Sequence, residues 1–154
     1  MGWRPGEKIL VFYPRNTYNI DDLAKFNKIG WLSGFRIHLF DRIDKESIQD
    51  LVEELNSFRP KMLLVFPSPL NMIAETIRQH NLPLKHHPEL INTSGETFFD
   101  CQRKNIASVF TKSKVEDSYG SVELGEIAHE TEGGLEVFSN VSYVETAPNE
   151  NGKH

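Results

Sequence analysis

Apolar residues recur along this chain at two different spacings, and the alternation between them predicts its secondary structure. Short β-branched, aromatic or wholly apolar runs are typical of strands, and they occur at 8–13, 36–40, 62–66 and 90–93. Apolar residues three and four positions apart are typical of amphipathic helices, and this spacing occurs at 19–32, 45–58, 70–77 and 99–110. The alternation over the first two-thirds of the chain predicts βαβ units on a mostly parallel sheet.

Residue types mark the boundaries of some elements. Ser68 is expected to cap the helix that follows the run at 62–66, with Pro69 at its first position. Beyond Tyr119, three short segments with strand character follow one another at 126–130, 135–138 and 141–145. We therefore predict an α/β fold, a mostly parallel sheet flanked by helices, with a short antiparallel β extension at the C-terminal end.

Length and composition suit one globular unit. The chain has 154 residues, of which 38% are hydrophobic, and domains of about 100–150 residues are the commonest size. We expect a single α/β unit at 1–147 and a disordered polar tail at 148–154. The sole cysteine, Cys101, excludes an internal disulfide and is expected in the core or at its boundary.

Charge and hydropathy argue against two classes of partner. The net charge is -5 and no basic tract offsets it, so binding to nucleic acid phosphates is not indicated. No apolar run approaches the ~20 residues that span a bilayer, and the polar N-terminus does not resemble a signal peptide. We expect a cytoplasmic protein that binds neither nucleic acid nor membranes.

Two small motifs stand where such a sheet binds ligands, beyond the carboxyl ends of its strands. Residues 92–96 read NTSGE, and residues 119–123 read YGSVE. A Ser-Gly turn lets the backbone come close to a ligand, and the start of a following helix adds N–H donors. Each motif alone also has a structural explanation: the first as a helix entry in which Ser94 caps and Glu96 complements the dipole, the second as a turn beside a packed aromatic.

The order, spacing and placement of the two motifs resemble adenylate-forming (AMP-binding) enzymes, in particular the phenylacetate-CoA ligase-like branch found with capsular polysaccharide genes. In that branch a Ser-Gly-Glu turn, a helix and a Tyr-Gly-Ser-Thr-Glu turn precede a β hairpin. The likeness continues downstream at Gly125, Ile127, Ala128, Gly134, Leu135, Val144 and Glu145. Upstream, residues 3–8 resemble the family's entry into its second subdomain, and 59–70 resemble a strand and helix start that lead toward the acyl pocket.

The resemblance implies a role in ATP binding for eight residues. Those expected to bind the nucleotide are Ser94, Gly95, Glu96, Tyr119, Gly120, Ser121 and Val122, and Glu123 is expected to bind magnesium. In this assignment, Gly95 and Glu96 line the adenine and ribose side, and Tyr119 lies against the adenine ring, which suits an aromatic face. A hard cation prefers carboxylate oxygen, as Glu123 offers.

The resemblance also implies a reaction and its partners. The family joins a carboxylate to ATP, giving acyl-AMP and pyrophosphate, and then passes the acyl group to a thiol, usually coenzyme A. Its phosphate loop is expected before Trp3, and its ribose-binding aspartate and C-terminal lid with a catalytic lysine are expected beyond the last residues. We therefore expect the second subdomain of a larger enzyme, with no catalytic residue of its own, inactive alone and completed by the missing subdomains.

Two alternatives remain open. Val122 stands where the family has threonine, and a lost hydrogen bond to a charged group costs roughly 1.5–3 kcal/mol, which favours a noncatalytic nucleotide-binding or interaction module of the same fold. The chain could also be an unrelated nucleotide- or sugar-binding α/β domain, since fold does not decide function. Residues 67–70 and 16–18 either border an acyl pocket or are ordinary connectors, and apolar surface left by missing subdomains would favour self-association.

Overall fold

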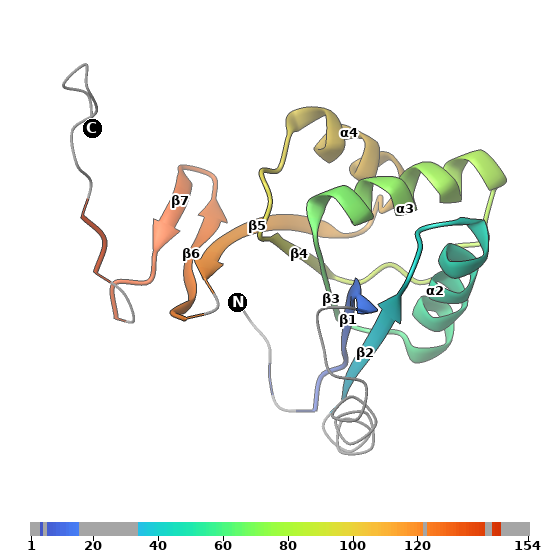
Figure 1. Ribbon diagram of the computed structural model, residues 1–154, viewed down its shortest axis with the longest axis horizontal. Coiled ribbons are helices and arrows are strands. Elements are labelled where there is room, and N and C mark those ends of the chain that lie inside the picture. Colours follow the sequence, from blue (N-terminus) through green and yellow to red (C-terminus); the bar gives the residue numbers. More distant parts are fainter. Residues whose placement is uncertain (1–3, 5, 16–33, 122, 141–142, 146–154) are drawn as a thin grey trace.

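One seven-stranded sheet organises the molecule, in the strand order β2-β1-β3-β4-β5-β6-β7 (Figure 1). The computed structural model describes Arg4 and residues 6–15, 34–121, 123–140 and 143–145. The strands are β1 (Ile9–Pro14), β2 (Phe35–Phe40), β3 (Met62–Val65), β4 (Leu90–Ser94), β5 (Lys114–Ser121), β6 (Gly125–Thr131) and β7 (Gly134–Val137). Strands β1 to β5 run parallel, whereas β5, β6 and β7 pair antiparallel. The predicted α/β architecture with an antiparallel C-terminal extension is confirmed.

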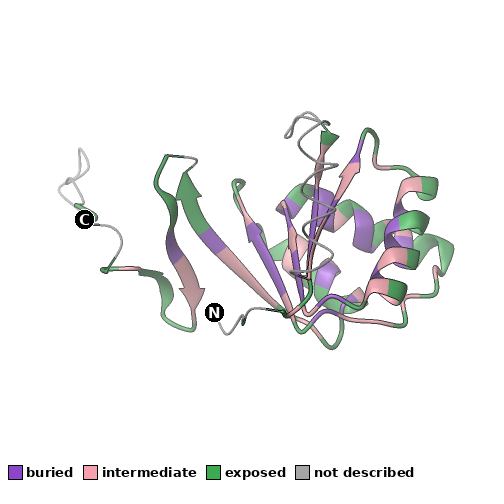
Figure 2. Ribbon diagram, turned by 90° about the horizontal axis from the view of Figure 1, so that it is seen from below, coloured by how far each residue is buried: buried purple, intermediate pink, exposed green. Residues whose placement is uncertain are grey.

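Three described helices cover one face of the parallel sheet (Figure 1). They are α2 (Lys45–Phe58), α3 (Pro67–His80) and α4 (Asp100–Val109). Alternate strand residues meet them in one apolar core, whose strand members include Leu10, Phe12, Leu63, Val65 and Ile91. Figure 2 shows the buried positions concentrated on the central strands and on the facing sides of the helices. No helix among the described segments has the length and apolar character needed to span a membrane.

Some sequence predictions differ from the structure at element ends. Helix α3 begins at Pro67, two residues before the predicted first helical position, so Ser68 lies inside the helix and does not cap it. Of the strand predicted at 141–145, residues 143–145 form no strand and the others lie outside the described residues. The helix predicted at 19–32 and the tail at 148–154 also lie outside them. Cys101 lies on α4 but is exposed, so its expected place in the core is wrong.

A half-buried carboxylate fastens α2 to the edge strand β2. Glu54 on α2 contacts His38 Nδ1 and accepts a hydrogen bond from Arg36 Nη1 at 3.3 Å, both from β2. Burial alone would raise the pKa of Glu54, but the His38 hydrogen bond and the charges of His38 and Arg36 outweigh it and hold that pKa below its usual value. The ionised form of Glu54 therefore stabilises the fold.

We predict that Glu54→Gln lowers the free energy of unfolding by roughly 1–2 kcal/mol at pH 7, because bonds to a charged acceptor are lost. A lowered folded-state pKa gives stability that is present above the unfolded pKa and is lost as pH falls through the folded value. The difference from wild type should therefore shrink below pH 4.5, the unperturbed value for this group. Urea unfolding at several pH values measures it. Glu53→Gln, on the exposed side of the same helix, is the control, and an equal effect of both changes would contradict the role of Glu54.

Candidate functional site

The two sequence motifs lie on neighbouring strands and end at the same edge of the sheet. NTSGE begins in β4 and YGSVE in β5, and these strands are parallel, with Ser94 paired in register with Ser118. Gly95 and Tyr119 are each the next residue, so they follow adjacent positions about 5 Å apart. The structure therefore brings the two motifs together at the carboxyl end of the sheet.

The NTSGE turn depends on a glycine packed against an aromatic ring. Gly95 has φ +79°, a conformation that disfavours side chains, and a Cβ atom there would lie 3.0 Å from Phe66 Cε1. The Phe66 ring in turn stacks on Tyr13, with ring centroids 4.5 Å apart and planes 2° from parallel. These rings from the ends of β3 and β1 extend the motif edge, and sequence analysis missed them because only their tertiary contact links them to Gly95.

Glu96 caps a helix other than the one expected. Its Oε2 accepts a hydrogen bond from the backbone N–H of Ser68 at 2.9 Å, in the first turn of α3. Phe66, the N-cap residue of α3, supplies no side-chain cap, so a carboxylate from the next strand end takes that place and complements the helix dipole. The alternative from sequence, in which Ser94 caps the following helix and Glu96 complements its dipole, is therefore wrong in its detail. Helix α4 begins only at Asp100, and Ser94 belongs to β4.

Most of YGSVE belongs to a strand and not to a turn. Tyr119, Gly120 and Ser121 are the last residues of β5, which continues into antiparallel pairing with β6. The Tyr119 side chain is 61% exposed. Ser121 Oγ accepts from the backbone N–H of Leu124 at 3.2 Å, closing the hairpin turn in which Glu123 is exposed. Val122 lies outside the described residues.

Gly120 is required by the hairpin itself. The register between β5 and β6 shifts between Tyr119 and Gly120. A Cβ atom at Gly120 would lie only 2.4 Å from the carbonyl oxygen of Gly125 and 3.1 Å from Glu126 Cα. Packing of the hairpin therefore requires glycine at position 120, independently of any ligand that the Gly120 backbone binds.

A buried polar layer lies directly behind the motifs. Ser118 is 8% exposed, and its hydroxyl donates to Asn92 Oδ1 at 3.1 Å or to the carbonyl oxygen of Thr93 at 3.2 Å. Asn92 is 7% exposed, and its Nδ2 has no hydrogen-bond partner among the residues that the structure describes. These bonds join β4 to β5 one residue before Tyr119, so they hold the two motif ends together.

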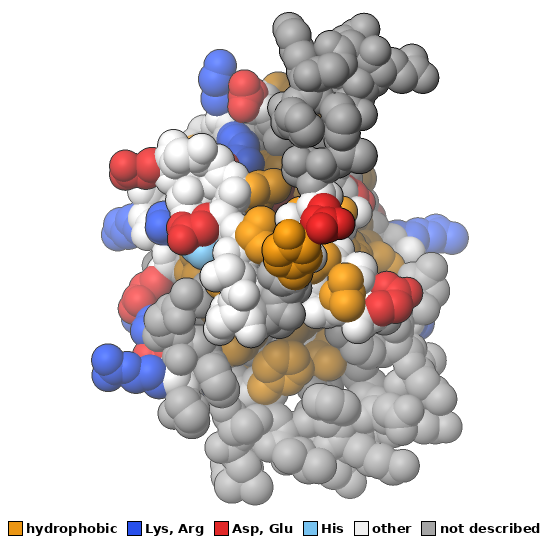
Figure 3. Space-filling model, turned by 90° about the vertical axis from the view of Figure 1, so that its left-hand side faces the viewer, with side chains coloured by type: hydrophobic (Ala, Val, Ile, Leu, Met, Phe, Trp, Pro, Cys, Tyr) orange, Lys and Arg blue, Asp and Glu red, His pale blue; other side chains and the backbone are white. Residues whose placement is uncertain are grey.

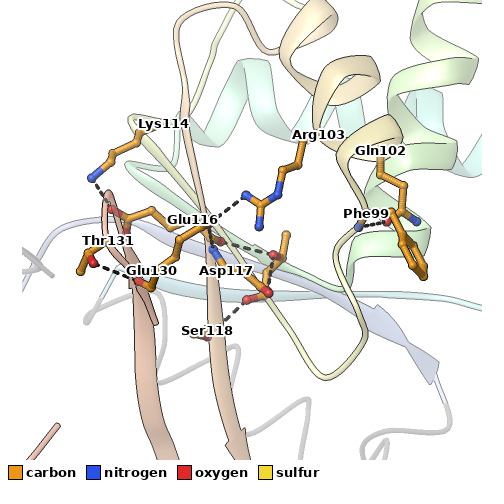
Figure 4. Close-up of polar contacts among 11 residues, drawn as sticks. Phe99, Gln102, Arg103, Lys114, Glu116, Asp117, Ser118, Glu130 and Thr131 are labelled. Atoms are coloured by element: carbon orange, nitrogen blue, oxygen red, sulfur yellow. Dashed lines mark hydrogen bonds and ion pairs between the residues drawn. The ribbon is translucent and has the colours of Figure 1, made fainter. Parts of the chain in front are cut away.

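An ionic network ties α4 to β6 and, through β6, to β5 and β4. Arg103 on α4 donates to Glu130 on β6 at 2.9 Å, and Glu130 also accepts from the backbone N–H of Asp117 at 2.9 Å (Figure 4). Asp117 accepts from the Thr93 hydroxyl at 2.9 Å. Burial raises the pKa of Asp117, although the Thr93 hydrogen bond and the Arg103 charge oppose this. Sequence analysis did not single out these residues, because they are paired through contacts distant along the chain.

Glu123 is the carboxylate that sequence analysis assigned to magnesium at this edge. No group of three or more His, Cys, Asp or Glu side chains suited to a metal occurs among the described residues. Magnesium usually keeps several waters and takes one or two carboxylates together with substrate phosphates. The exposed Glu123 carboxylate fits that use, as one protein ligand beside a nucleotide.

A cavity lies at the opposite edge of the sheet, whereas residues 67–70 lie beside the NTSGE motif, since Ser68 bonds to Glu96. A cavity of about 610 Å³ is lined by Met62, Leu90 and Lys114, the first residues of their strands, so it opens at the opposite edge of the sheet. Of residues 67–70, all but Ser68 are buried as the first turn of α3. Residues 16–18 lie outside the described residues. At the motif edge, Tyr119, Ser121 and Glu123 are exposed.

No family model matches this sequence, and no curated protein matches it. Among solved structures it resembles a 2-hydroxyisobutyryl-CoA ligase in complex with 2-HIB-AMP and CoA, at 21% identity and TM-score 0.60, over 86% of this chain and 29% of that one. A malonyl-CoA ligase with methylmalonyl-CoA and AMP bound matches at 17% identity and TM-score 0.56, over 82% and 26%. VinN with L-aspartate matches at 20% identity and TM-score 0.55, over 82% and 30%.

The likeness concerns one segment of those proteins. The chain spans less than a third of the length of each, and at these identities the match shows a shared fold. Its α/β fold is therefore that of a part of CoA ligases whose structures hold an acyl-AMP or AMP.

We predict that Gly120→Ala lowers the free energy of unfolding by about 1–3 kcal/mol, because the new methyl group overpacks the hairpin backbone. Gly133→Ala in the adjoining turn is the control, since its Cβ would meet only Thr131 Oγ1 at 3.9 Å. Urea denaturation of both variants makes the comparison. Equal stability of the two would show that β5 and β6 are not packed as closely as described.

We also predict that Glu96→Ala destabilises the chain by about 0.5–2 kcal/mol, the usual cost of losing a helix cap. Glu96→Gln should lose less, because its amide oxygen still accepts from Ser68 and only the charge is removed. Thermal unfolding followed by circular dichroism checks the order. Glu75→Ala, in the middle of α3, serves as control, and the cap is disproved if Glu96→Ala matches it.

Proposed function

We propose that this chain is the second subdomain of an ATP-dependent adenylate-forming enzyme, of the acyl- or aryl-CoA ligase kind. It would contribute the adenine and magnesium side of the ATP site. The observation that carries this proposal is the pairing of Ser94 with Ser118, which puts NTSGE and YGSVE at one sheet edge. The fold shared with CoA ligases supports it, and the motifs favour the phenylacetate-CoA ligase-like branch.

The adenine base is assigned to the surface between the two motifs. The Tyr119 ring is largely exposed and offers a flat apolar face for the base. Gly95 keeps the neighbouring turn free of a side chain, and Ser94 shapes that turn. Glu96 has one oxygen engaged with α3, so we assign it to fixing the turn, with its other oxygen directed to the ribose.

The phosphates are assigned to the end of the hairpin. Gly120 and Ser121 are exposed there and would offer their backbone to the α-phosphate, and Glu123 would hold magnesium. When bound, ATP supplies the phosphate that a carboxylate attacks, giving acyl-AMP and pyrophosphate before transfer to coenzyme A. The chain's own residues bind and orient the nucleotide and hold its counterion.

Catalysis in this proposal belongs to the assembled enzyme. Electrostatic stabilisation of developing charge is usually the largest catalytic contribution, and the phosphate loop and lid lysine of the family are not found in this sequence. The partners are then a small carboxylate, coenzyme A and the remaining subdomains, in the cytoplasm where ATP and coenzyme A are used. The isolated chain should be inactive.

A second candidate is a noncatalytic nucleotide-binding or interaction module of the same fold. Val122 favours it, because valine cannot give the hydroxyl hydrogen bond that threonine gives the α-phosphate in the family. Binding of AMP or ATP to the chain would favour the first candidate over an interaction module that no longer binds a nucleotide.

We predict that calorimetry detects ATP and AMP binding to the chain, and that Tyr119→Ala weakens both about tenfold, since stacking on one base is worth about 1–3 kcal/mol. Glu123→Gln should weaken ATP only when magnesium is present and should leave AMP unaffected. Tyr143→Ala, another exposed tyrosine, is the control. Absence of nucleotide binding by the wild-type chain would refute the proposed site.

Pyrophosphate exchange tests the incomplete character of the site. The chain alone should give no exchange with any carboxylic acid, because the groups that stabilise the phosphates come from outside it. Measurable exchange would contradict the assignment to an incomplete segment while leaving nucleotide binding intact.

A further inference from the structure

The sheet ends at β7, whose outer edge has unused backbone hydrogen-bonding groups. Phe138 N–H donates to the Ile127 carbonyl oxygen at 2.9 Å, so Phe138 and Ile127 form a hydrogen-bonded pair at the end of the ladder between β6 and β7. Because hydrogen-bonded pairs alternate in an antiparallel ladder, the backbone groups of Leu135 and Val137 point outward. No backbone hydrogen bond reaches this outer side from any part of the chain that the structure describes.

The side chains of β7 give its two faces opposite character. Leu135 and Val137 share one face and are 56% and 37% exposed, while Glu136 lies on the other. Leu124 in the neighbouring turn is 63% exposed. Figure 3 looks onto this end of the molecule and shows apolar side chains gathered at its centre with acidic side chains at their border.

The hairpin is also strongly acidic. Residues 125–137 contain four glutamates and neither lysine nor arginine. Glu130 is paired with Arg103, but Glu132 and Glu136 make no ion pair with any residue the structure describes. Edge strands are usually protected by short length, charged side chains, proline or a covering segment. β7 is short and has neither lysine nor proline among its four residues, and its one charged residue, Glu136, suits a basic partner.

We propose that β7 is a docking edge for one extended segment of a partner protein in which apolar and basic residues alternate. The segment adds a strand to the sheet through the outward backbone of Leu135 and Val137. Its apolar side chains pack on those two residues, and its lysine or arginine side chains meet Glu136 and Glu132. A second copy of this chain is disfavoured as the occupant, because two acidic hairpins would repel each other. Nucleotide binding plays no part in this surface.

Fluorescence anisotropy with a defined probe tests the docking edge. The probe is a fluorescein-labelled seven-residue peptide in which lysine and valine alternate, titrated with the intact chain. We expect saturable binding. A peptide with proline in place of its central valine should bind at least about tenfold more weakly, because proline lacks the N–H that pairs with β7. A peptide with glutamate in place of every lysine should not bind.

Two variants locate the interaction on β7. Leu135→Pro removes an outward N–H and leaves the ladder to β6 intact, and Glu136→Lys reverses the charge without touching the backbone. Each should weaken the lysine peptide at least about tenfold, and Glu136→Lys should improve binding of the glutamate peptide. Glu75→Lys on α3 is the matched charge control and should bind like wild type. Circular dichroism verifies the fold of each variant.

Four results would overturn the proposal. The first is no saturable binding of the lysine peptide, and the second is equal binding of the lysine and proline peptides. The third is wild-type affinity for the lysine peptide in a folded Leu135→Pro or Glu136→Lys chain. The fourth is a dimer of the unliganded chain in sedimentation, if Glu136→Lys strengthens that dimer or Leu135→Pro abolishes it. The last would assign the edge to a second copy of this chain.

Discussion

The parallel register between β4 and β5 is the constraint on which the candidate site depends. The buried Ser118 hydroxyl bonds to Asn92 and the Thr93 carbonyl oxygen, and these bonds form with Ser94 and Ser118 paired in register. A slip of one residue would move every β5 side chain to the other face. It would bury Asp117 or Tyr119 in that position, and Tyr119 would no longer follow the strand end beside Gly95. Stability and site geometry therefore rest on the same few hydrogen bonds.

The sequence predicted elements well wherever their determinants are local. Helix α2 was predicted at its observed bounds from its regular apolar period, and the structure shows in addition a capping box of Asp44 and Ser47 at its start. The start of α3 was misplaced because its cap is Glu96, 28 positions away in sequence. Local propensity cannot reveal a cap that arrives from another strand end. The same limit explains why YGS was taken for a turn: only pairing with β6 makes it strand.

The candidate site divides in a similar way between local and tertiary causes. The positions of NTSGE and YGSVE at strand ends follow from apolar patterning together with the rule that parallel strands end at one edge. The contacts that surround the two motifs do not follow from these patterns. Phe66 and Tyr13 reach Gly95 from other strands, and the Asp117, Glu130 and Arg103 network links three elements. Gly120, expected from sequence to bind the nucleotide, has an additional role in hairpin packing that only the contact with the β6 backbone reveals.

The central claim is that two neighbouring strand ends form one nucleotide site, and an NMR titration of the nitrogen-15-labelled chain with magnesium and ATP tests it most directly. The account predicts that amide shifts change together at Gly95 and Tyr119, on adjacent strands. Amides at the opposite edge, such as those of Met62, Leu90 and Lys114, should stay unchanged. Shifts confined to that opposite edge, or changes at only one of the two motifs under saturating nucleotide, would contradict it.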